Sequence, residues 1–214
     1  LLYSHFNKKA EGLALEDYKP GDKLIPFKIV GEYKGPDLEG MEYEQLIPWV
    51  KPVEVDNDGK WCPSDKGFRV ILGAYVTTED GTGIVHIAPT FGADDAFVAR
   101  AAGIPSLFMI NKKGETRPMV DLTGKFYLLD ELDETFVKTC VDVEAYKEYQ
   151  GRWVKNAYDP QFTVDGKYDE KAAQAAETLD IYICMKMKQE NLAFKTEKHV
   201  HNYPHCWRTD KPVL

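Results

Sequence analysis

The sequence predicts a mainly β domain with packed α-helices, and three observations predict it. Short apolar runs rich in β-branched residues alternate with turns that contain glycine, proline and aspartate, which is typical of strands joined by tight connections. Three longer stretches place apolar residues three and four positions apart, which is typical of helices that pack on one face. The chain has 214 residues, 43% of them hydrophobic, so it is long enough to bury a sizeable core.

Three expected strands come first along the chain. Residues 24–32 form one, because apolar side chains cluster there before the turn sequence KGPD at 34–37. Residues 44–50 form a second, short strand, which Pro48 restricts to an edge or a bulge since proline donates no ladder hydrogen bond. Residues 68–77 form a third, and the turn after it leads into the following stretch as a hairpin or meander.

The stretch 80–95, with the sequence DGTGIVHIAPTFGADD, concentrates the chemistry of the chain. Gly81 and Gly83 allow the backbone to approach another backbone or a ligand closely. The β-branched residues after them predict a buried strand that carries His86. A proline and a glycine then end this strand at a tight turn.

A helix is expected directly after that turn, over residues 93–102. The stretch is rich in alanine and is followed by a glycine and a proline that stop a helix. Asp94 and Asp95 lie at its N-terminus, where the helix dipole favours negative charge. Taken singly, His86 fits a buried core histidine and the two acids fit a helix cap. Because all three meet at one turn, a shared functional site is an equally supported alternative.

The second half of the chain predicts one hairpin and two helices. Residues 106–110 and 117–120 are expected to pair across a glycine-containing loop. Residues 132–150 and 170–189 carry apolar residues at helical spacing, and we expect these stripes to face the core. Residues 158–168 are polar and turn-rich, so an inserted surface loop is expected there.

Composition and charge exclude several classes of protein. The formal net charge of −8 argues against a protein whose main task is to coat nucleic acid, because that affinity comes from clustered Lys and Arg. The chain has no apolar run of about 18 residues and its first residues are polar, so neither a membrane span nor a signal peptide is predicted. We therefore expect a cytoplasmic protein that contacts no membrane.

Metal binding has only weak support in the residue spacing. The four cysteines lie far apart and form no Cys-x-x-Cys pair, so free thiols are expected rather than disulfides or a zinc site. His199, His201, His205 and Cys206 are zinc-ligand types, but their spacing fits no common closed site. A zinc-dependent hydrolase that uses them is kept as an alternative. The acidic turn at 56–59 lacks calcium-loop spacing, and a surface turn is expected.

Two motifs carry a resemblance to a known family. The first resembles the post-transfer editing domain of class I isoleucyl-tRNA synthetases, an insertion called connective polypeptide 1, and it runs Gly81-Thr82-Gly83-Ile84-Val85-His86-x-Ala88-Pro89-x-x-Gly92-x-Asp94-Asp95. The second is similar to the segment by which that insertion returns to the catalytic domain, and it spans residues 201–208 (HNYPHCWR). Valyl- and leucyl-tRNA synthetases have related domains and are the near alternatives, but they usually differ at the histidine or in the exit segment.

The resemblance implies a β-barrel-like editing domain with helices packed around it. It assigns residues 1–198 to this single domain, with helical and loop insertions at about 130–190, and residues 199–214 to the return segment. Adenylate-forming signature motifs are absent from the sequence, so we expect a piece of a longer synthetase. ATP and Mg²⁺ are expected only in the absent catalytic domain, and no cofactor or metal in this piece. The expected partners of this monomer are the 3′ end of aminoacylated tRNA(Ile) and the remainder of the same synthetase chain.

The resemblance also implies roles for individual residues. Asp95 holds the α-ammonium of the misattached amino acid, and His86 lies against its side chain and helps to exclude isoleucine. A carboxylate suits the ammonium, since a charge-assisted hydrogen bond in a partly dry pocket fixes the ester carbonyl for attack by water. Asp94 is the expected helix cap. The substrate-binding positions are Gly81, Thr82, Gly83, Phe91 and Asp94.

The implied reaction is hydrolysis of valyl-tRNA(Ile), with no side chain assigned as its general base. The family's threonine-rich motif, which forms another wall of the pocket, has no counterpart in the chain. The editing site of this piece is therefore expected to be incomplete. An alternative is a docking module that binds the tRNA 3′ end without hydrolysis.

Overall fold

The computed structural model describes residues 7–19, 22–77, 79, 82–165, 167–194, 196 and 204–208. The chain divides into two compact units. Unit 1 comprises Leu1–Ile47 and Ser64–Ser106, and unit 2 comprises Pro48–Pro63 and Leu107–Leu214. The assignment of residues 1–198 to one domain and 199–214 to a return segment stays a prediction.

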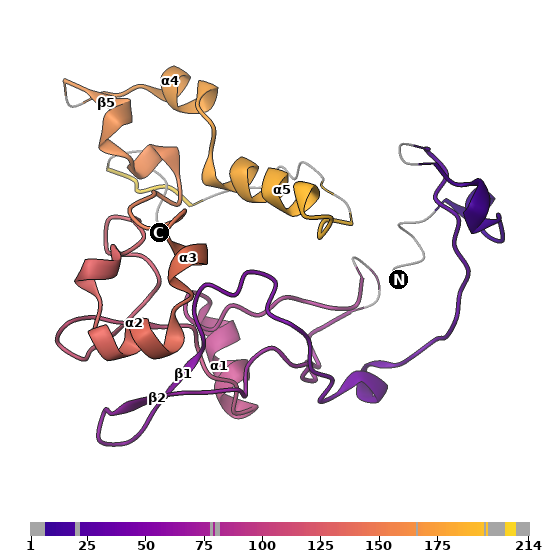
Figure 1. Ribbon diagram of the computed structural model, residues 1–214, viewed down its shortest axis with the longest axis horizontal. Helices are drawn as coiled ribbons and strands as arrows, with labels where there is room; N and C mark the ends of the chain where they lie inside the picture. Colours follow the sequence, from indigo (N-terminus) through magenta and orange to yellow (C-terminus); the bar gives the residue numbers. More distant parts are fainter. Residues whose placement is uncertain are drawn as a thin grey trace. The chain divides into compact units, whose positions relative to one another are not determined.

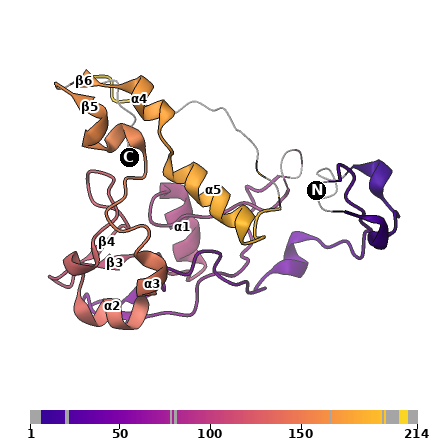
Figure 2. The ribbon, with the colours of Figure 1, turned by 45° about the horizontal axis from the view of Figure 1, so that its top comes forward.

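The described residues of unit 2 form three antiparallel hairpins, each a separate two-stranded sheet. The first joins β1 (Val53–Val55) to β2 (Trp61–Pro63), and the expected surface turn lies between them. The Asp56 carboxylate closes that turn by accepting hydrogen bonds from two backbone N–H groups within it. The other pairs are β3 (Met109–Ile110) with β4 (Thr116–Arg117), and β5 (Thr163–Val164) with β6 (Lys167–Tyr168) (Figure 2). The β3–β4 hairpin confirms the predicted one, but no barrel is shown by the described residues.

Two helices stand where the sequence predicted one over residues 132–150. They are α2 (Glu134–Cys140) and α3 (Val143–Tyr146). Val141 between them is extended and bridges Val50, and Asp142 caps α3 by accepting a 3.0 Å hydrogen bond from the Ala145 N–H. An aspartate side chain that bonds the backbone ahead of it starts a new helix more readily than it continues an old one.

The predicted helix over residues 170–189 is broken in the same way. It forms α4 (Glu170–Ala175) and α5 (Leu179–Gln189), which Figure 1 shows as two separate helices. Ala176 is extended, and the Thr178 hydroxyl accepts a 3.3 Å hydrogen bond from the N–H of Ile181. Threonine is a favoured N-cap, so the chain restarts a helix here. Short 3₁₀ segments complete the unit: η5 (Leu129–Glu131), η6 (Asn156–Tyr158) and η7 (Pro160–Phe162).

An aromatic cluster forms the core of unit 2. The rings of Trp49 and Tyr149 lie with centroids 3.8 Å apart, and Phe126 meets Trp49 edge-on at 5.8 Å. Tyr146 is fully buried beside them, and its hydroxyl donates a 2.8 Å hydrogen bond to the carbonyl of Tyr127. Such rings bury large apolar areas and prefer these offset and edge-to-face contacts.

Unit 1 is mostly irregular. Its helical segments are η2 (Lys8–Ala10), η3 (Leu15–Asp17), η4 (Gly35–Leu38) and α1 (Ala93–Ala101). The strands predicted at 24–32 and 68–77 are wrong for the described residues, which show only isolated bridges there. The strand predicted at 44–50 is wrong too, since only Val50 pairs, with Val141.

Unit 1 lacks a core of large side chains. Among its described residues, the buried hydrophobic side chains are those of Ala10 and Ala99. Most of its larger apolar side chains are exposed, for example Val30 and Ile84. Strands need continuous partners and a covered face, and the described residues of this unit supply only isolated bridges and mostly exposed apolar side chains. No helix in the described part of the chain combines the length and apolar character needed to cross a membrane.

Candidate functional site

The helix α1 organises the candidate site. It spans Ala93–Ala101 and confirms the helix predicted at 93–102. Gly103 ends it with a φ of +67°, and the N–H of Ile104 donates a 2.8 Å hydrogen bond to the carbonyl of Ala99. A glycine in this left-handed conformation lets the chain satisfy the last helical carbonyls.

A tight turn precedes α1, and both backbone polar groups of Ala88 take part in closing it. The carbonyl of Ala88 accepts hydrogen bonds from the N–H groups of Phe91 and Gly92, at 3.1 and 3.0 Å. The N–H of Ala88 donates a 2.8 Å hydrogen bond to Oδ2 of Asp95. The half-buried Asp95 therefore connects the first turn of the helix to the residue at which the preceding turn begins.

The prediction that Asp94 caps the helix is wrong. The N-cap residue is Gly92, which has an extended backbone and makes no side-chain cap. Asp94 is exposed in the first turn of α1, where its charge complements the positive end of the helix dipole.

The prediction that a buried strand carries His86 is also wrong. No strand lies among residues 82–92, His86 is exposed, and Ile84 and Val85 are 61% and 53% exposed. Thr82 gives the physical reason. Its hydroxyl accepts a 3.3 Å hydrogen bond from the Ile84 N–H and donates a 3.1 Å bond to the Ile84 carbonyl, so it occupies both backbone groups that a strand would pair.

The remaining predicted site residues lie around the same turn. Phe91 is 62% exposed on the turn itself. Gly83 has a φ of +75°, while Gly81 lies outside the described residues. In the described part of the chain, no hydrogen bond or ion pair joins His86 to Asp95. The structure therefore brings Asp95 together with Ala88 and Gly92, whereas the exposed His86 lies two residues before Ala88 along the chain.

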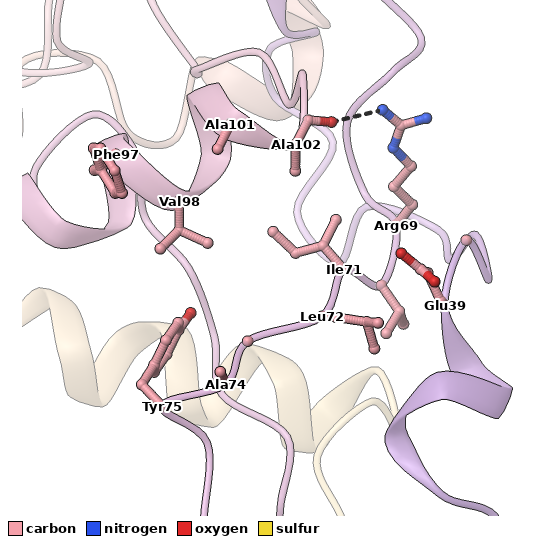
Figure 3. Close-up of a pocket in the computed structure, with 13 residues that line it drawn as sticks. Glu39, Arg69, Ile71, Leu72, Ala74, Tyr75, Phe97, Val98, Ala101 and Ala102 are labelled. Atoms are coloured by element: carbon pink, nitrogen blue, oxygen red, sulfur yellow. Dashed lines mark hydrogen bonds between the residues drawn. The ribbon is translucent and has the colours of Figure 1, made fainter.

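A surface hollow of about 550 Å³ lies against the part of α1 that follows Asp95 (Figure 3). Phe97, Val98 and Ala101 line it from the helix, and the stretch 69–75 lines it from the other side. The Arg69 guanidinium donates a 3.4 Å hydrogen bond to the carbonyl of Ala102. The sequence did not predict this hollow, because residues 69–75 were expected to form part of a strand. The available signal was that these residues combine apolar side chains with one arginine.

The Asp95 carboxylate can still accept further hydrogen bonds. A carboxylate offers about four acceptor positions, and the Ala88 N–H occupies one of them. Its negative charge makes it suited to a cationic group such as an ammonium, which would bond more strongly than a neutral donor. Chemically, the turn can thus orient a ligand that carries a positive charge.

Metal-ligand clusters are absent from the described residues, where no three His, Cys, Asp or Glu side chains group together. His205 is exposed, and His199 and His201 lie outside the described part. None of the four cysteines forms a disulfide, as predicted. Burial raises the pKa of the Cys140 thiol, against smaller opposing contributions from Thr139 and Lys51, so Cys140 is not an activated thiolate.

Comparison with known proteins identifies close relatives over the whole chain. It is 81% identical over 214 residues to the isoleucine–tRNA ligase of Bacteroides thetaiotaomicron and 50% identical over 215 residues to that of Porphyromonas gingivalis. These alignments cover 100% of this chain but only 18% and 17% of the relatives. The isoleucine–tRNA ligase of Treponema denticola is 31% identical over 189 residues, which cover 88% of this chain and 13% of that protein. No family model matches the chain.

Proposed function

The chain belongs to the isoleucine–tRNA ligase family, and from this we propose that it is part of an editing domain that hydrolyses valyl-tRNA(Ile). The position of Asp95 carries the proposal. Its half-buried carboxylate accepts a 2.8 Å hydrogen bond from the N–H of Ala88, two residues after the exposed His86, and lies in the first turn of α1. The chain spans less than a fifth of the length of the relatives that it matches, so the proposal concerns one part of a larger ligase.

Asp95 acts in this proposal as the anchor of the substrate. The α-ammonium of the misattached valine bonds to the carboxylate, and this fixes the ester carbonyl relative to the turn. A water molecule adds to that carbonyl, the ester C–O bond breaks, and the ribose oxygen leaves with a proton. The attacking water is ordered by backbone groups or by the ribose hydroxyls, since no side chain is assigned as general base.

His86 acts as a sieve on the amino-acid side chain. Its exposed imidazole lies two residues before Ala88, whose N–H holds the anchor. Isoleucine exceeds valine by one methylene, and a binding pocket alone discriminates weakly between such ligands. Isoleucyl-tRNA synthetases are themselves the standard example of this limit and of the second, hydrolytic site that overcomes it.

In this proposal, the barrel-like fold is a property of the complete ligase. The described part of unit 1 buries little apart from Ala10 and Ala99, and it leaves apolar residues such as Val30, Ile84 and Phe91 exposed. Many exposed apolar side chains on one unit are expected where a surface packs against other parts of a protein. We therefore expect the missing pocket wall to come from the remainder of the ligase, and hydrolysis to require it.

The test uses a full-length ligase that carries this sequence. Asp95→Ala is expected to let valyl-tRNA(Ile) accumulate, while aminoacylation with isoleucine proceeds normally. Asp180→Ala is the matched control, because Asp180 is likewise an acid in the first turn of a helix, α5, but is exposed and has no assigned role. Hydrolysis of valyl-tRNA at the wild-type rate by Asp95→Ala would overturn the proposal. Binding of the tRNA 3′ end without release of valine by the wild-type ligase would instead favour a docking module.

A further inference from the structure

Gly92 leaves open the space that the Asp95 carboxylate occupies. A Cβ atom placed on residue 92 would lie 2.7 Å from Oδ2 and 2.9 Å from Cγ of Asp95. It would also lie 3.0 Å from the Asp95 Cβ. The first two distances are shorter than non-bonded carbon–oxygen and carbon–carbon contacts tolerate, so a side chain at residue 92 must displace the carboxylate.

The backbone does not explain why residue 92 is glycine. Its φ of −85° and ψ of 125° lie in the extended region that every L-residue adopts without strain. Gly83 and Gly103 differ in this respect, since each has a positive φ. The requirement at residue 92 therefore concerns space alone.

The helix does not explain the glycine either. Residue 92 is the N-cap of α1, a position at which serine, aspartate or asparagine would satisfy a free backbone N–H of the first turn. Gly92 supplies no such bond. The chain thus lacks a better cap at a position where a side chain would collide with Asp95.

We propose that Gly92 is a positioning residue for Asp95, which it serves by keeping the carboxylate against the N–H of Ala88. The proposal rests on the proposed function, in which that carboxylate anchors the substrate ammonium. The two closest atoms, Oδ2 and Cγ, belong to the rotatable end of the Asp95 side chain and can swing away, while the contact with its Cβ is relieved by a shift of a few tenths of an ångström. A substitution at residue 92 therefore moves the anchor and leaves the fold intact.

The kinetic test compares Gly92→Ser with Gly35→Ala in the full-length ligase. Serine restores a favoured N-cap, so the helix is retained while the Cβ still collides. Deacylation of valyl-tRNA(Ile) by Gly92→Ser is expected to fall by on the order of 10- to 100-fold, as for a misplaced reacting group. Gly35→Ala adds a Cβ in open space, within 4 Å of nothing, and keeps the wild-type rate. Unchanged isoleucine aminoacylation shows that each variant is folded.

Hydrogen exchange over the peptide that contains Ala88 separates this inference from the proposed function. Gly92→Ser and Asp95→Ala are both expected to speed exchange there, because both remove the acceptor of the Ala88 N–H. If Asp95→Ala keeps wild-type deacylation, the proposed function fails, while the exchange result still tests the position of the carboxylate. If Asp95→Ala loses deacylation but Gly92→Ser keeps both the wild-type rate and slow exchange, the role of Gly92 is overturned alone.

Discussion

The carboxylate of Asp95 accepts a 2.8 Å hydrogen bond from the backbone N–H of Ala88, seven residues earlier in the chain. One side chain of α1 thereby closes the turn that leads into its own helix. In the proposed function the same group binds the substrate ammonium, so its structural and chemical roles coincide. The two roles differ in what they need, because the turn needs an acceptor and the ammonium needs a negative charge.

Asp95→Asn separates these two roles. The asparagine Oδ1 still accepts from the Ala88 N–H, so hydrogen exchange at Ala88 is expected to stay slow. The lost charge weakens binding of the ammonium, since a hydrogen bond to a charged group contributes about 1.5–3 kcal/mol. Single-turnover hydrolysis of valyl-tRNA(Ile) is therefore expected to slow by roughly 10- to 100-fold. An asparagine variant as active as wild type would show that the charge is not used.

His86→Ala is expected to widen the range of substrates. If the imidazole excludes isoleucine, its removal lets the full-length ligase hydrolyse correctly charged isoleucyl-tRNA(Ile) as well as the valyl ester. Stability should change by less than about 0.5 kcal/mol, because the side chain is exposed and makes no hydrogen bond in the described part of the chain. Deacylation assays with both esters measure the effect. A stable isoleucyl ester alongside continued cleavage of the valyl ester would refute the sieve.

Tyr146→Phe and Tyr149→Phe form a matched pair in the core of unit 2. Both tyrosines are fully buried. The Tyr146 hydroxyl bonds to the Tyr127 carbonyl at 2.8 Å, whereas the Tyr149 hydroxyl makes no hydrogen bond of good geometry in the described residues and has the Lys186 ammonium as a charged neighbour. Tyr146→Phe should therefore cost about 1 kcal/mol, and Tyr149→Phe should be neutral or stabilising. Urea unfolding followed by tryptophan fluorescence measures both, and equal costs would contradict the assignment.

Asp121 should make stability depend on pH in the acid range. Burial alone would raise the pKa of this carboxyl, but hydrogen bonds from the Thr123 hydroxyl and from the backbone N–H groups of Lys125 and Thr123 outweigh it and lower the pKa. The ionised form is thus favoured in the folded state. Its stabilisation is fully present above the carboxyl's ordinary pKa of about 3.9 and is lost as the pH falls through the lower, folded-state value.

Asp121→Ala tests this dependence. The substitution should destabilise the chain by about 1 kcal/mol at neutral pH, from the lost hydrogen bonds. The difference from wild type should shrink as the pH falls below about 4. Urea unfolding at a series of pH values measures it, with Asp130→Ala as the control for the loss of one exposed carboxylate. A difference that stays constant down to pH 2 would contradict the prediction.

The fold was predictable wherever its determinants are local. The helix α1, its glycine stop, the β3–β4 hairpin and the surface turn at Asp56 all follow from residues within a few positions of one another. The long helices expected in unit 2 were wrong because Asp142 and Thr178 each bond the backbone ahead of them and begin a new helix. The strands expected in unit 1 were wrong because apolar alternation cannot supply a strand's partner.

The sequence by itself determined the family, through the motif that ends in Asp95. It also determined that two acidic residues lie at the start of a helix. Only the tertiary structure decided that Gly92, and not Asp94, caps that helix, and that His86 is exposed rather than buried. It also decided that Asp95 bonds to Ala88 across the space left by Gly92. The physical reason is that motifs and residue spacing specify which groups are close along the chain. Hydrogen-bond partners and free space depend instead on which segments the folded backbone brings close together in three dimensions.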